Sequence, residues 1–317
     1  MIPLIVPIDH TAAKADTISG LEASVLQTLA YFDIFHYPLR EDEIPQFLDT
    51  NYNPILLAAV LRLLVSDKRI FSYQGHYMIQ DNPLLVHRRY EANAKAVALL
   101  EKAVRIGRFL QKFPYVSAVA ISGSLSKNVA GPDADIDFFV ITKSNRLWIA
   151  RTGMHLFKKL TFLTGRQHYY CMNYYVDEAA LALDEQNIFT AIEIKTLLPV
   201  SGSTVMQQFF NRNSWTEEWF PNYKTRTQAM PDSRSSVIKK VFEWLLNNKC
   251  GEMLDDFLHK ATSNRWRRKE DKGKRNAKGD MMGLITGKHF ARSNPGRFQE
   301  RVLRLYEEKL KKLVGER

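Results

Sequence analysis

The sequence predicts an α/β fold (α+β) in which helices pack on a mixed β-sheet. Two apolar runs with the character of buried strands enclose a Gly-Ser pair and a short polar segment, and helical and strand patterns alternate after them. This order of strand, short helix, strand, helix and strand is typical of an α/β unit with a mixed sheet. The predicted strands are 115–122, 135–142 and 166–177. The predicted longer helices are 145–165 and a helix that begins at residue 187 and is stopped by Pro199.

A smaller unit is predicted before this core, over residues 19–86, following a leader at 1–18. It contains three helical patterns and then two short alternating runs joined at Gln74-Gly75, which is typical of a β-hairpin. Three helices and a hairpin resemble a winged helix-turn-helix module. DNA binding by this module is not favoured, because its third helix carries only Arg62 before its end and its second helix is acidic. Packing against a partner or the neighbouring domain is the favoured role.

The remaining regions complete the predicted domain organisation. A long helical pattern ends before Pro114 and bridges to the sheet, so the domain of the mixed sheet is predicted to cover 87–235. Residues 236–317 read as a helical, basic region, with a Gly-containing loop at 264–280. No internal repeat interrupts this four-part division.

Composition and cysteine content favour an ordinary globular protein. The chain has 317 residues, of which 45% are hydrophobic and 25% are charged. Its two cysteines are too few to indicate a disulfide framework. The first residues lack the basic and long apolar parts of a secretory signal, and no apolar run reaches the length of a membrane span. We therefore expect a cytoplasmic protein that does not associate with membranes.

Positive charge is concentrated in the last third of the chain. Of the net charge of +11, residues 224–317 contribute +12, with 24 Lys and Arg against 12 Asp and Glu, and the first 223 residues are close to neutral. Contact with phosphates, in RNA, another polyanion or a nucleotide, is one explanation. A solvated basic surface is the other. The run around Trp266 combines basic and aromatic residues as nucleic-acid contacts do, and a solvated loop explains it equally well.

Two carboxylates stand inside an apolar strand pattern. Side chains two residues apart share one face of a strand, so Asp135 and Asp137 are predicted to project together while Ile136 enters the core. Two ionised carboxylates held side by side repel each other and are costly to bury without a cation. A hard divalent cation with oxygen ligands, Mg²⁺ or Mn²⁺, is the expected cofactor.

A possible phosphate site precedes the carboxylates. Gly123 and Ser124 close the first strand and open a short helix, where backbone amides, a hydroxyl and the missing Cβ favour binding of a phosphate. A lone Asp-x-Asp is more often a strand end, and a lone Gly-Ser is more often a turn. Together, between two apolar strands, they indicate metal-assisted transfer of a nucleotide.

The segment GSLSKNVAGPDADIDFFV resembles the signature of the DNA polymerase β-like nucleotidyltransferase superfamily, GSxARGxAxxxSDIDLLV in its small bacterial members. Lys127, Asn128 and Ala134 replace the family's Arg, Gly and Ser. Asn tolerates the left-handed conformation of a Gly, and Lys keeps the charge without the two-pronged geometry of Arg. The resemblance is specific over about 20 residues and weaker in the next helix and strand. It implies a nucleotidyltransferase-type mixed sheet, a metal on Asp135 and Asp137, and nucleotide phosphates on Gly123, Ser124 and Lys127.

The resemblance also implies a third acid on a later strand that faces the pair and helps to deprotonate the acceptor. Asn173 occupies the central position of the predicted strand, and an amide cannot act as a base. Asp177 is on the same face four residues later and is the candidate catalytic acid if the register is shifted. Absence of a strict third acid is the other reading.

Two functions follow from these features. The first is a metal-dependent nucleotidyltransferase that moves a nucleoside monophosphate from a nucleoside triphosphate to the hydroxyl of a small molecule, protein or RNA. The alternative is a nucleotide-sensing or RNA-binding protein that has the same fold without catalysis.

Overall fold

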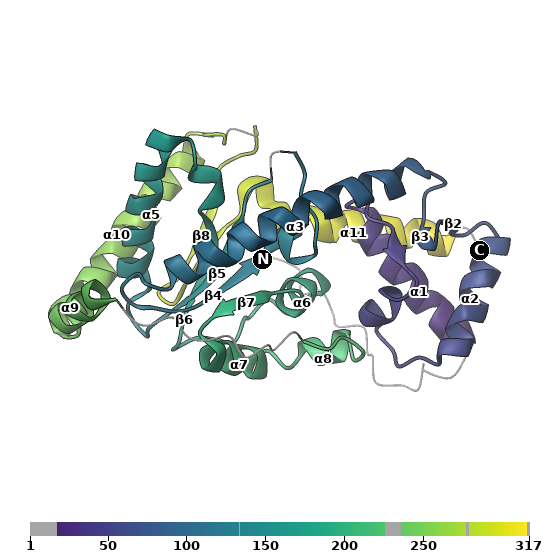
Figure 1. Cartoon of the computed structure of the whole chain (residues 1–317), viewed down its shortest axis with the longest axis horizontal. Helices are drawn as coiled ribbons and strands as arrows, with labels where there is room; N and C mark the ends of the chain where they lie inside the picture. Colours follow the sequence, from purple (N-terminus) through teal and green to yellow (C-terminus); the bar gives the residue numbers. More distant parts are fainter. Residues whose placement is uncertain (1–17, 133, 226–235, 277–278, 316–317) are drawn as a thin grey trace. The chain divides into compact units, whose positions relative to one another are not determined.

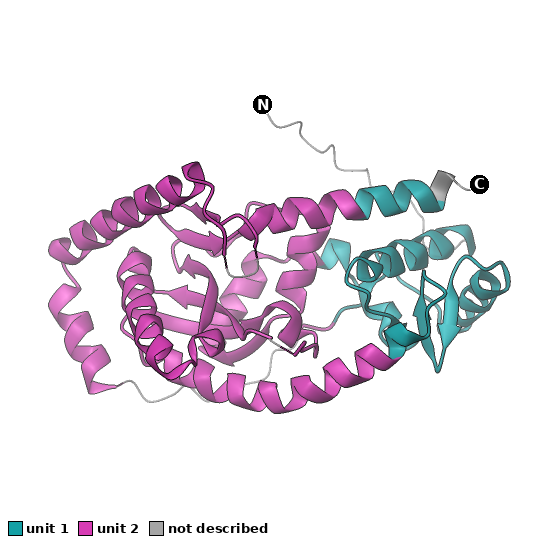
Figure 2. Ribbon diagram, turned by 90° about the horizontal axis from the view of Figure 1, so that it is seen from above, with its two compact units in different colours: residues 1–86, 217–223, 306–317 teal, residues 87–216, 224–305 magenta. Residues whose placement is uncertain are grey.

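The computed structural model describes residues 18–132, 134–225, 236–276 and 279–315. The chain divides into two compact units, coloured separately in Figure 2. The N-terminal unit comprises Met1–Val86, Glu217–Tyr223 and Tyr306–Arg317, and the sheet unit comprises His87–Thr216 and Lys224–Leu305. The predicted leader lies outside the described residues except for Ile18, and the predicted four-part domain division stays a prediction.

The N-terminal unit combines helices with a small sheet of strand order β1-β3-β2. The predicted hairpin is confirmed: β2 and β3 pair antiparallel, and the two residues between them, Gln74 and Gly75, have φ of 49° and 70°, as in a type I′ turn. Whether the unit acts as a winged helix stays a prediction. Its elements are α1 (Ile18–Asp33), β1 (Leu39–Arg40), η1 (Ile44–Phe47), α2 (Pro54–Ser66), β2 (Phe71–Tyr73) and β3 (His76–Met78).

The second predicted helix of this unit is a single 3₁₀ turn, η1. The carbonyl of Phe47 accepts a hydrogen bond from the Thr28 hydroxyl at 2.8 Å, and the chain turns to extended geometry at Leu48. The next helix, α2, begins after Asn53, whose side chain accepts a hydrogen bond from the backbone N–H of Ile55 at 2.9 Å.

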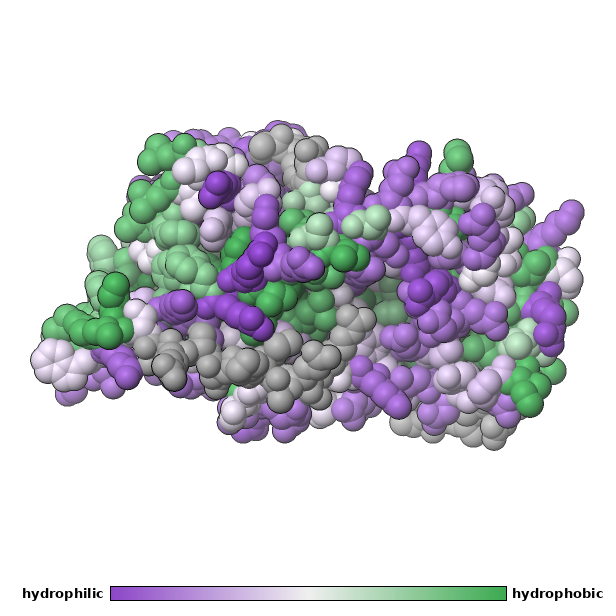
Figure 3. Space-filling model, viewed as in Figure 1, coloured by the Kyte–Doolittle hydropathy of each residue, from purple (hydrophilic) through white to green (hydrophobic). Residues whose placement is uncertain are grey.

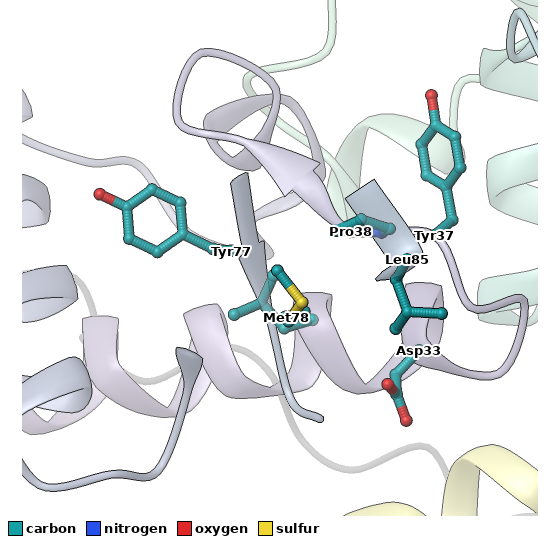
Figure 4. A pocket seen from close by; sticks show the side chains of 7 residues that line it. Asp33, Tyr37, Pro38, Tyr77, Met78 and Leu85 are labelled. Atoms are coloured by element: carbon teal, nitrogen blue, oxygen red, sulfur yellow. The ribbon is translucent and has the colours of Figure 1, made fainter. Parts of the chain in front are cut away.

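A small pocket lies in the N-terminal unit (Figure 4). Its one acidic side chain, Asp33, is 4% exposed, accepts a hydrogen bond from Gln80 Nε2 at 2.9 Å and forms an ion pair with Lys309. Because this carboxylate is already paired, the pocket is a packing feature of the unit. Its lining residues are Leu29, Asp33, Tyr37, Pro38, Tyr77, Met78 and Leu85.

The sheet unit is built on six strands among its described residues, in the order β7-β4-β5-β6-β9-β8 (Figure 1). Only β5 and β6 are parallel neighbours in this sheet, and the other pairs described are antiparallel. The mixed sheet predicted from the sequence is therefore confirmed. Its strands are β4 (Val116–Ser122), β5 (Asp137–Thr142), β6 (Cys171–Asp177), β7 (Leu198–Ser201), β8 (Leu284–Thr286) and β9 (Phe290–Ser293).

Helices cover both faces of the sheet (Figure 1). On one face Trp148 of α5 is fully buried, stacks on His259 with ring centroids 4.7 Å apart, and donates to the carbonyls of Gly287 and Lys288. That face carries α3 (Leu84–Leu110), α5 (Leu147–Thr161) and α10 (Lys249–Asp271), and the opposite face carries α6 (Ile188–Lys195) and α7 (Ser203–Arg212). Shorter or flanking elements are α4 (Gly123–Ser126), η2 (Phe162–Thr164), η3 (Gln167–Tyr169), α8 (Thr216–Trp219), α9 (Val237–Leu246), η4 (Pro295–Arg297) and α11 (Phe298–Gly315).

Three sequence expectations differ from this architecture. The C-terminal region is not purely helical, because β9 pairs with β6 and β8 extends the same sheet, which covers an otherwise open strand edge. The basic segment expected to be a loop from residue 264 continues α10 as far as Asp271. The helix expected from residue 187 up to Pro199 ends at Lys195, and Leu198–Ser201 form β7, an edge strand where Pro199 is tolerated. Among the described helices, none is both long and apolar enough to cross a membrane.

Replacement of Gly202 tests the junction between β7 and α7. Gly202 has φ of +73°, and a Cβ there would lie 2.3 Å from the carbonyl oxygen of Ser117 and 2.5 Å from the Ala118 Cβ. Because both the backbone conformation and the space exclude a side chain, we expect Gly202→Ala to lower the unfolding free energy by roughly 2–4 kcal/mol in urea denaturation. The control is Gly153→Ala in α5, where no atom lies within 4 Å of the added Cβ. This variant should be neutral or more stable by up to about 1 kcal/mol, and an equal loss in both variants would contradict the assignment.

The stability of the α5–α10 contact should depend on pH through Asp255. Burial raises the pKa of Asp255 to about 6, against the lowering effect of hydrogen bonds from the backbone N–H groups of Ile149 and Trp148. Since its folded pKa lies above the ordinary value of 3.8, this carboxyl contributes stability that is present below pH 4 and lost as the pH rises through 6. We expect Asp255→Asn to lose less stability than the wild type between pH 4 and pH 6.5 in urea denaturation. Parallel pH profiles for the two proteins would contradict this.

Candidate functional site

The candidate site lies at one edge of the sheet, where β4 ends and both β5 and β6 begin. Ser122 is opposite Asp137 in the antiparallel pair of β4 and β5, and Asp137 is opposite Cys171 in the parallel pair of β5 and β6. The Gly-Ser turn, the aspartates and the first residues of β6 are therefore neighbours.

Asp135 and Asp137 flank the point where β5 begins. The strand starts at Asp137, and Asp135 lies in the segment just before it. Ile136 is fully buried, its N–H donates to the carbonyl of His168 at 3.1 Å, and its carbonyl accepts from the N–H of Cys171 at 3.2 Å. The segment thus continues the strand pairing, and alternation directs both carboxylates to the face opposite Ile136.

Gly123 is in close contact with the second carboxylate. Its φ is +67°, and a Cβ built on it would lie 2.7 Å from Oδ2 of Asp137. A side chain there would collide with the carboxylate and also strain the backbone. Because Gly123 has no side chain, the start of α4 can lie directly against the carboxylate of Asp137.

The short helix α4 presents its first turn at the same edge. Among the described residues no side chain caps its N-terminus at Ser122, and Ser124 is exposed. The first N–H groups of a helix have no partner within the helix, so they are suited to an anion. The turn closes through a hydrogen bond of 2.8 Å from the Ser126 hydroxyl to the carbonyl of Gly123. Asn128 has φ of 60°, which confirms that it adopts the left-handed conformation expected at the family's Gly position.

Lys127 is engaged by a residue that the sequence did not assign to it. Its Nζ donates to the carbonyl of Gly123 at 3.0 Å and to Oε1 of Glu193, on α6, at 2.7 Å. Both side chains are partly buried, with 18% and 30% exposed. The ion pair fixes the turn that carries Gly123. No spacing rule connects residues 66 positions apart, so only the fold identifies Glu193 as the partner.

Asn173 contacts the carboxylate directly. The register of β5 and β6 shifts between Phe138 and Phe139, and Asn173 is the additional, exposed residue of β6 at this bulge. Its Nδ2 donates a hydrogen bond to Oδ1 of Asp137. The sequence expectation that Asn173 occupies the position facing the pair agrees with this contact.

Asp177 is not brought to the pair, which corrects the hypothesis that it could serve as the third acid. It pairs with Thr142, five positions along β5 from Asp137, a separation of about 17 Å along the strand. Its fully buried carboxylate accepts from the N–H groups of Asn145 at 2.9 Å and Ala179 at 3.0 Å, and lies 2.9 Å from His289 Nδ1. Asp177 therefore fastens loops at the opposite edge of the sheet.

Cys171 and Lys158 also border the site, and sequence reasoning assigned neither of them to it. Lys158 Nζ lies 3.2 Å from Cys171 Sγ. Burial raises the pKa of the Cys171 thiol, Lys158 lowers it, and the charges of Asp137 and Asp135 raise it further. Both carboxylates are therefore close to the first residue of β6.

The donor set fits a hard divalent cation. Among the described residues no cluster of three His, Cys, Asp or Glu side chains could hold a metal by itself. Mg²⁺ commonly binds one or two carboxylates and completes its coordination with water and substrate phosphates. Asp135 and Asp137, beside the N-terminus of α4, match that two-carboxylate type.

Comparison with known proteins agrees with the geometry. Residues 104–198 match the family model described as Nucleotidyltransferase domain. The matched segment includes α4, both aspartates, Asn173 and Glu193. None of the curated proteins and none of the solved structures matches the chain.

Substitution of Asn173 by Asp tests whether the pair can bind a cation. In Asn173→Asp a third carboxylate replaces the amide that donates to Asp137, so without a divalent cation the unfolding free energy should fall by about 1–3 kcal/mol at pH 7. With millimolar Mn²⁺ the loss should be recovered, because three carboxylates bind the cation more tightly. Urea denaturation with and without Mn²⁺ measures both effects. Asn173→Ala is the control, since it loses the hydrogen bond without adding a ligand. If Mn²⁺ stabilises Asn173→Asp no more than Asn173→Ala, residue 173 does not face a bound cation.

Proposed function

We propose that the nucleotidyltransferase domain carried by residues 104–198 transfers a nucleoside monophosphate from a nucleoside triphosphate to an acceptor hydroxyl. One observation carries the proposal. The first residue of α4 has no side chain and lies directly against the carboxylate of Asp137, so a phosphate at α4 and a cation at the aspartates would be adjacent.

In this reaction the residues of the site would bind the phosphates, hold the cation and position the turn that carries Gly123. The backbone N–H groups at Gly123 and Ser124, with the Ser124 hydroxyl, would bind the β and γ phosphates. Asp135 and Asp137 would hold Mg²⁺ or Mn²⁺, which when bound neutralises the triphosphate and polarises the phosphoryl oxygens. Lys127 would act as a positioning residue, because its ion pair with Glu193 holds the turn that carries Gly123.

The proposed step is a displacement at phosphorus. The acceptor oxygen forms a bond to the α-phosphorus, the bond from that phosphorus to the oxygen bridging to the β-phosphorus breaks, and pyrophosphate leaves. The proton of the acceptor hydroxyl passes to water, because the amide of Asn173 cannot accept it. Orientation of the two reactants and charge neutralisation supply the rate enhancement.

A second candidate function is favoured by the same amide. Asn173 contacts Asp137 at the position where a third acid would act as a base, and this supports a nucleotide sensor or RNA-binding protein without catalysis.

The basic part of α10 supports a polyanionic partner, RNA in particular, under either function. Arg265, Arg267 and Arg268 lie on the helix, and Lys269 Nζ is 4.4 Å from the centre of the Trp266 ring. A helical row of cations beside an aromatic ring suits a phosphate backbone.

Nucleotide binding tests the proposal. Titration of the full chain with ATP, GTP, CTP and UTP by calorimetry should reveal Mg²⁺-dependent binding of at least one of them. Asp137→Asn should weaken that binding at least tenfold, because it removes a charged ligand of the cation. Asp256→Asn, an exposed acid in α10, should leave the affinity unchanged. Wild-type protein that is folded and binds none of the four with Mg²⁺ would refute the assignment.

Turnover distinguishes the two functions. With nucleotides labelled at the α-phosphate and a cell extract as the source of acceptors, an enzyme transfers label to one fraction and releases pyrophosphate in equal amount. Binding without pyrophosphate release identifies the sensor.

A further inference from the structure

The helix α9 of the sheet unit directs two of its polar side chains, Lys239 and Glu243, toward the body of the protein. Lys239 Nζ donates to the carbonyls of Gln111 at 3.0 Å and Val116 at 2.6 Å. One turn later, the Glu243 carboxylate accepts from the N–H of Tyr115 at 2.8 Å. These two residues are four apart and share one side of the helix, so that side is attached to the protein.

The other side of α9 is apolar and exposed. Val237, Val241 and Leu245 follow each other at intervals of four residues, so they form a stripe along the helix. Trp244 is 78% exposed and Val237 is 76% exposed. In Figure 3 hydrophobic residues gather at the lower left, where Figure 1 has α9. The exposed α9 face, as we name it, consists of Val237, Ile238, Val241, Phe242, Trp244 and Leu245.

This face is large enough for an interface. The six side chains are between 48% and 78% exposed. Together they present on the order of 700 Å² of apolar surface, more than the largest patch of a typical monomer and close to the roughly 800 Å² that each partner contributes to a standard interface. Leaving such an area in water is unfavourable, so a partner that covers it gains the hydrophobic free energy.

The charge around the face favours a protein over an anionic surface. Residues 237–257 contain three lysines and four acidic residues, so they are close to neutral. The cations of the C-terminal region are concentrated beyond them, from Arg265 to Arg275. A near-neutral apolar face neither attracts acidic lipids nor repels an identical face.

We propose that the exposed α9 face forms a twofold-symmetric homodimer, in which α9 of one copy packs against α9 of the other. A face that contacts its own copy across a twofold axis needs no second complementary surface, which makes this the commonest type of oligomer. The ten residues of α9 span about 15 Å, enough for knobs from successive turns to interlock at the 8–10 Å separation of packed helices.

The dimer would leave the candidate site open. Helix α9 is attached at Tyr115 and Val116, where β4 begins, whereas Asp137 is opposite Ser122, where β4 ends. The two ends of the strand are about 20 Å apart. The proposal therefore does not depend on the proposed function, and nucleotide binding serves as an independent check of folding.

Sedimentation velocity of the full chain across a range of micromolar concentrations tests the proposal. The wild type should sediment as a dimer. The variant Val241→Lys/Leu245→Glu should weaken association at least a hundredfold and sediment as a monomer. A matched control is Leu163→Glu, which charges an 87% exposed leucine outside the α9 face and should leave the dimer intact.

The other occupants of the face are outcomes that overturn the proposal. A wild type that is monomeric throughout refutes it, whether the face is then covered by a segment of its own chain or binds vesicles of anionic lipid. A dimer that survives the double variant also refutes it. A milder variant, Val241→Ser/Leu245→Ser, guards against misfolding. This variant should have the same melting temperature as the wild type and form a dimer that is at least tenfold weaker. An unchanged dimer counts against the proposal.

Discussion

The contact between Gly123 and Asp137 constrains the site more than any other feature. The antiparallel pairing of Ser122 with Asp137 brings the end of β4 to the start of β5, and the first residue of α4 then lies against the carboxylate. Gly123 has φ of +67°, and a Cβ built on it would lie only 2.7 Å from Oδ2 of Asp137, so only a residue without a Cβ fits there. The position of the carboxylate and the direction of the helix start therefore depend on each other.

The charged side chains around this contact are paired with groups from several different elements of the fold. The amide of Asn173 donates to Asp137 from the bulge in β6, and the Lys127 ammonium forms an ion pair with Glu193 of α6. The third carboxylate that sequence reasoning considered, Asp177, is satisfied by backbone N–H groups and His289 at the far edge. Among the residues that the structure describes, Asp135 and Asp137 are the two acids that flank the start of β5 at this edge.

The described residues between Lys224 and Leu305 belong to the sheet unit and do not form a separate helical region. Strands β9 and β8 extend the sheet beyond β6, and α10 packs beside α5, where Asp255 accepts from the N–H of Ile149. Helix α9 is attached by its polar side and exposes its apolar side. This region thus stabilises the sheet while providing a basic helix and an apolar face, two surfaces with different chemistry.

The sequence alone determined the local features. Alternation predicted the strands around the Gly-Ser pair, and the two-residue turn at Gln74-Gly75 predicted the hairpin. The motif spacing predicted that the Gly-Ser turn lies beside the aspartates. Each of these features depends on residues close in the chain. Tertiary structure decided the contacts between distant segments. Lys127 pairs with Glu193, and Asn173 contacts Asp137. Asp177 lies at the other end of the strands, and residues 198–201 form a strand instead of continuing a helix. Strand register and helix orientation are set by packing across the whole sheet, and no local spacing encodes them.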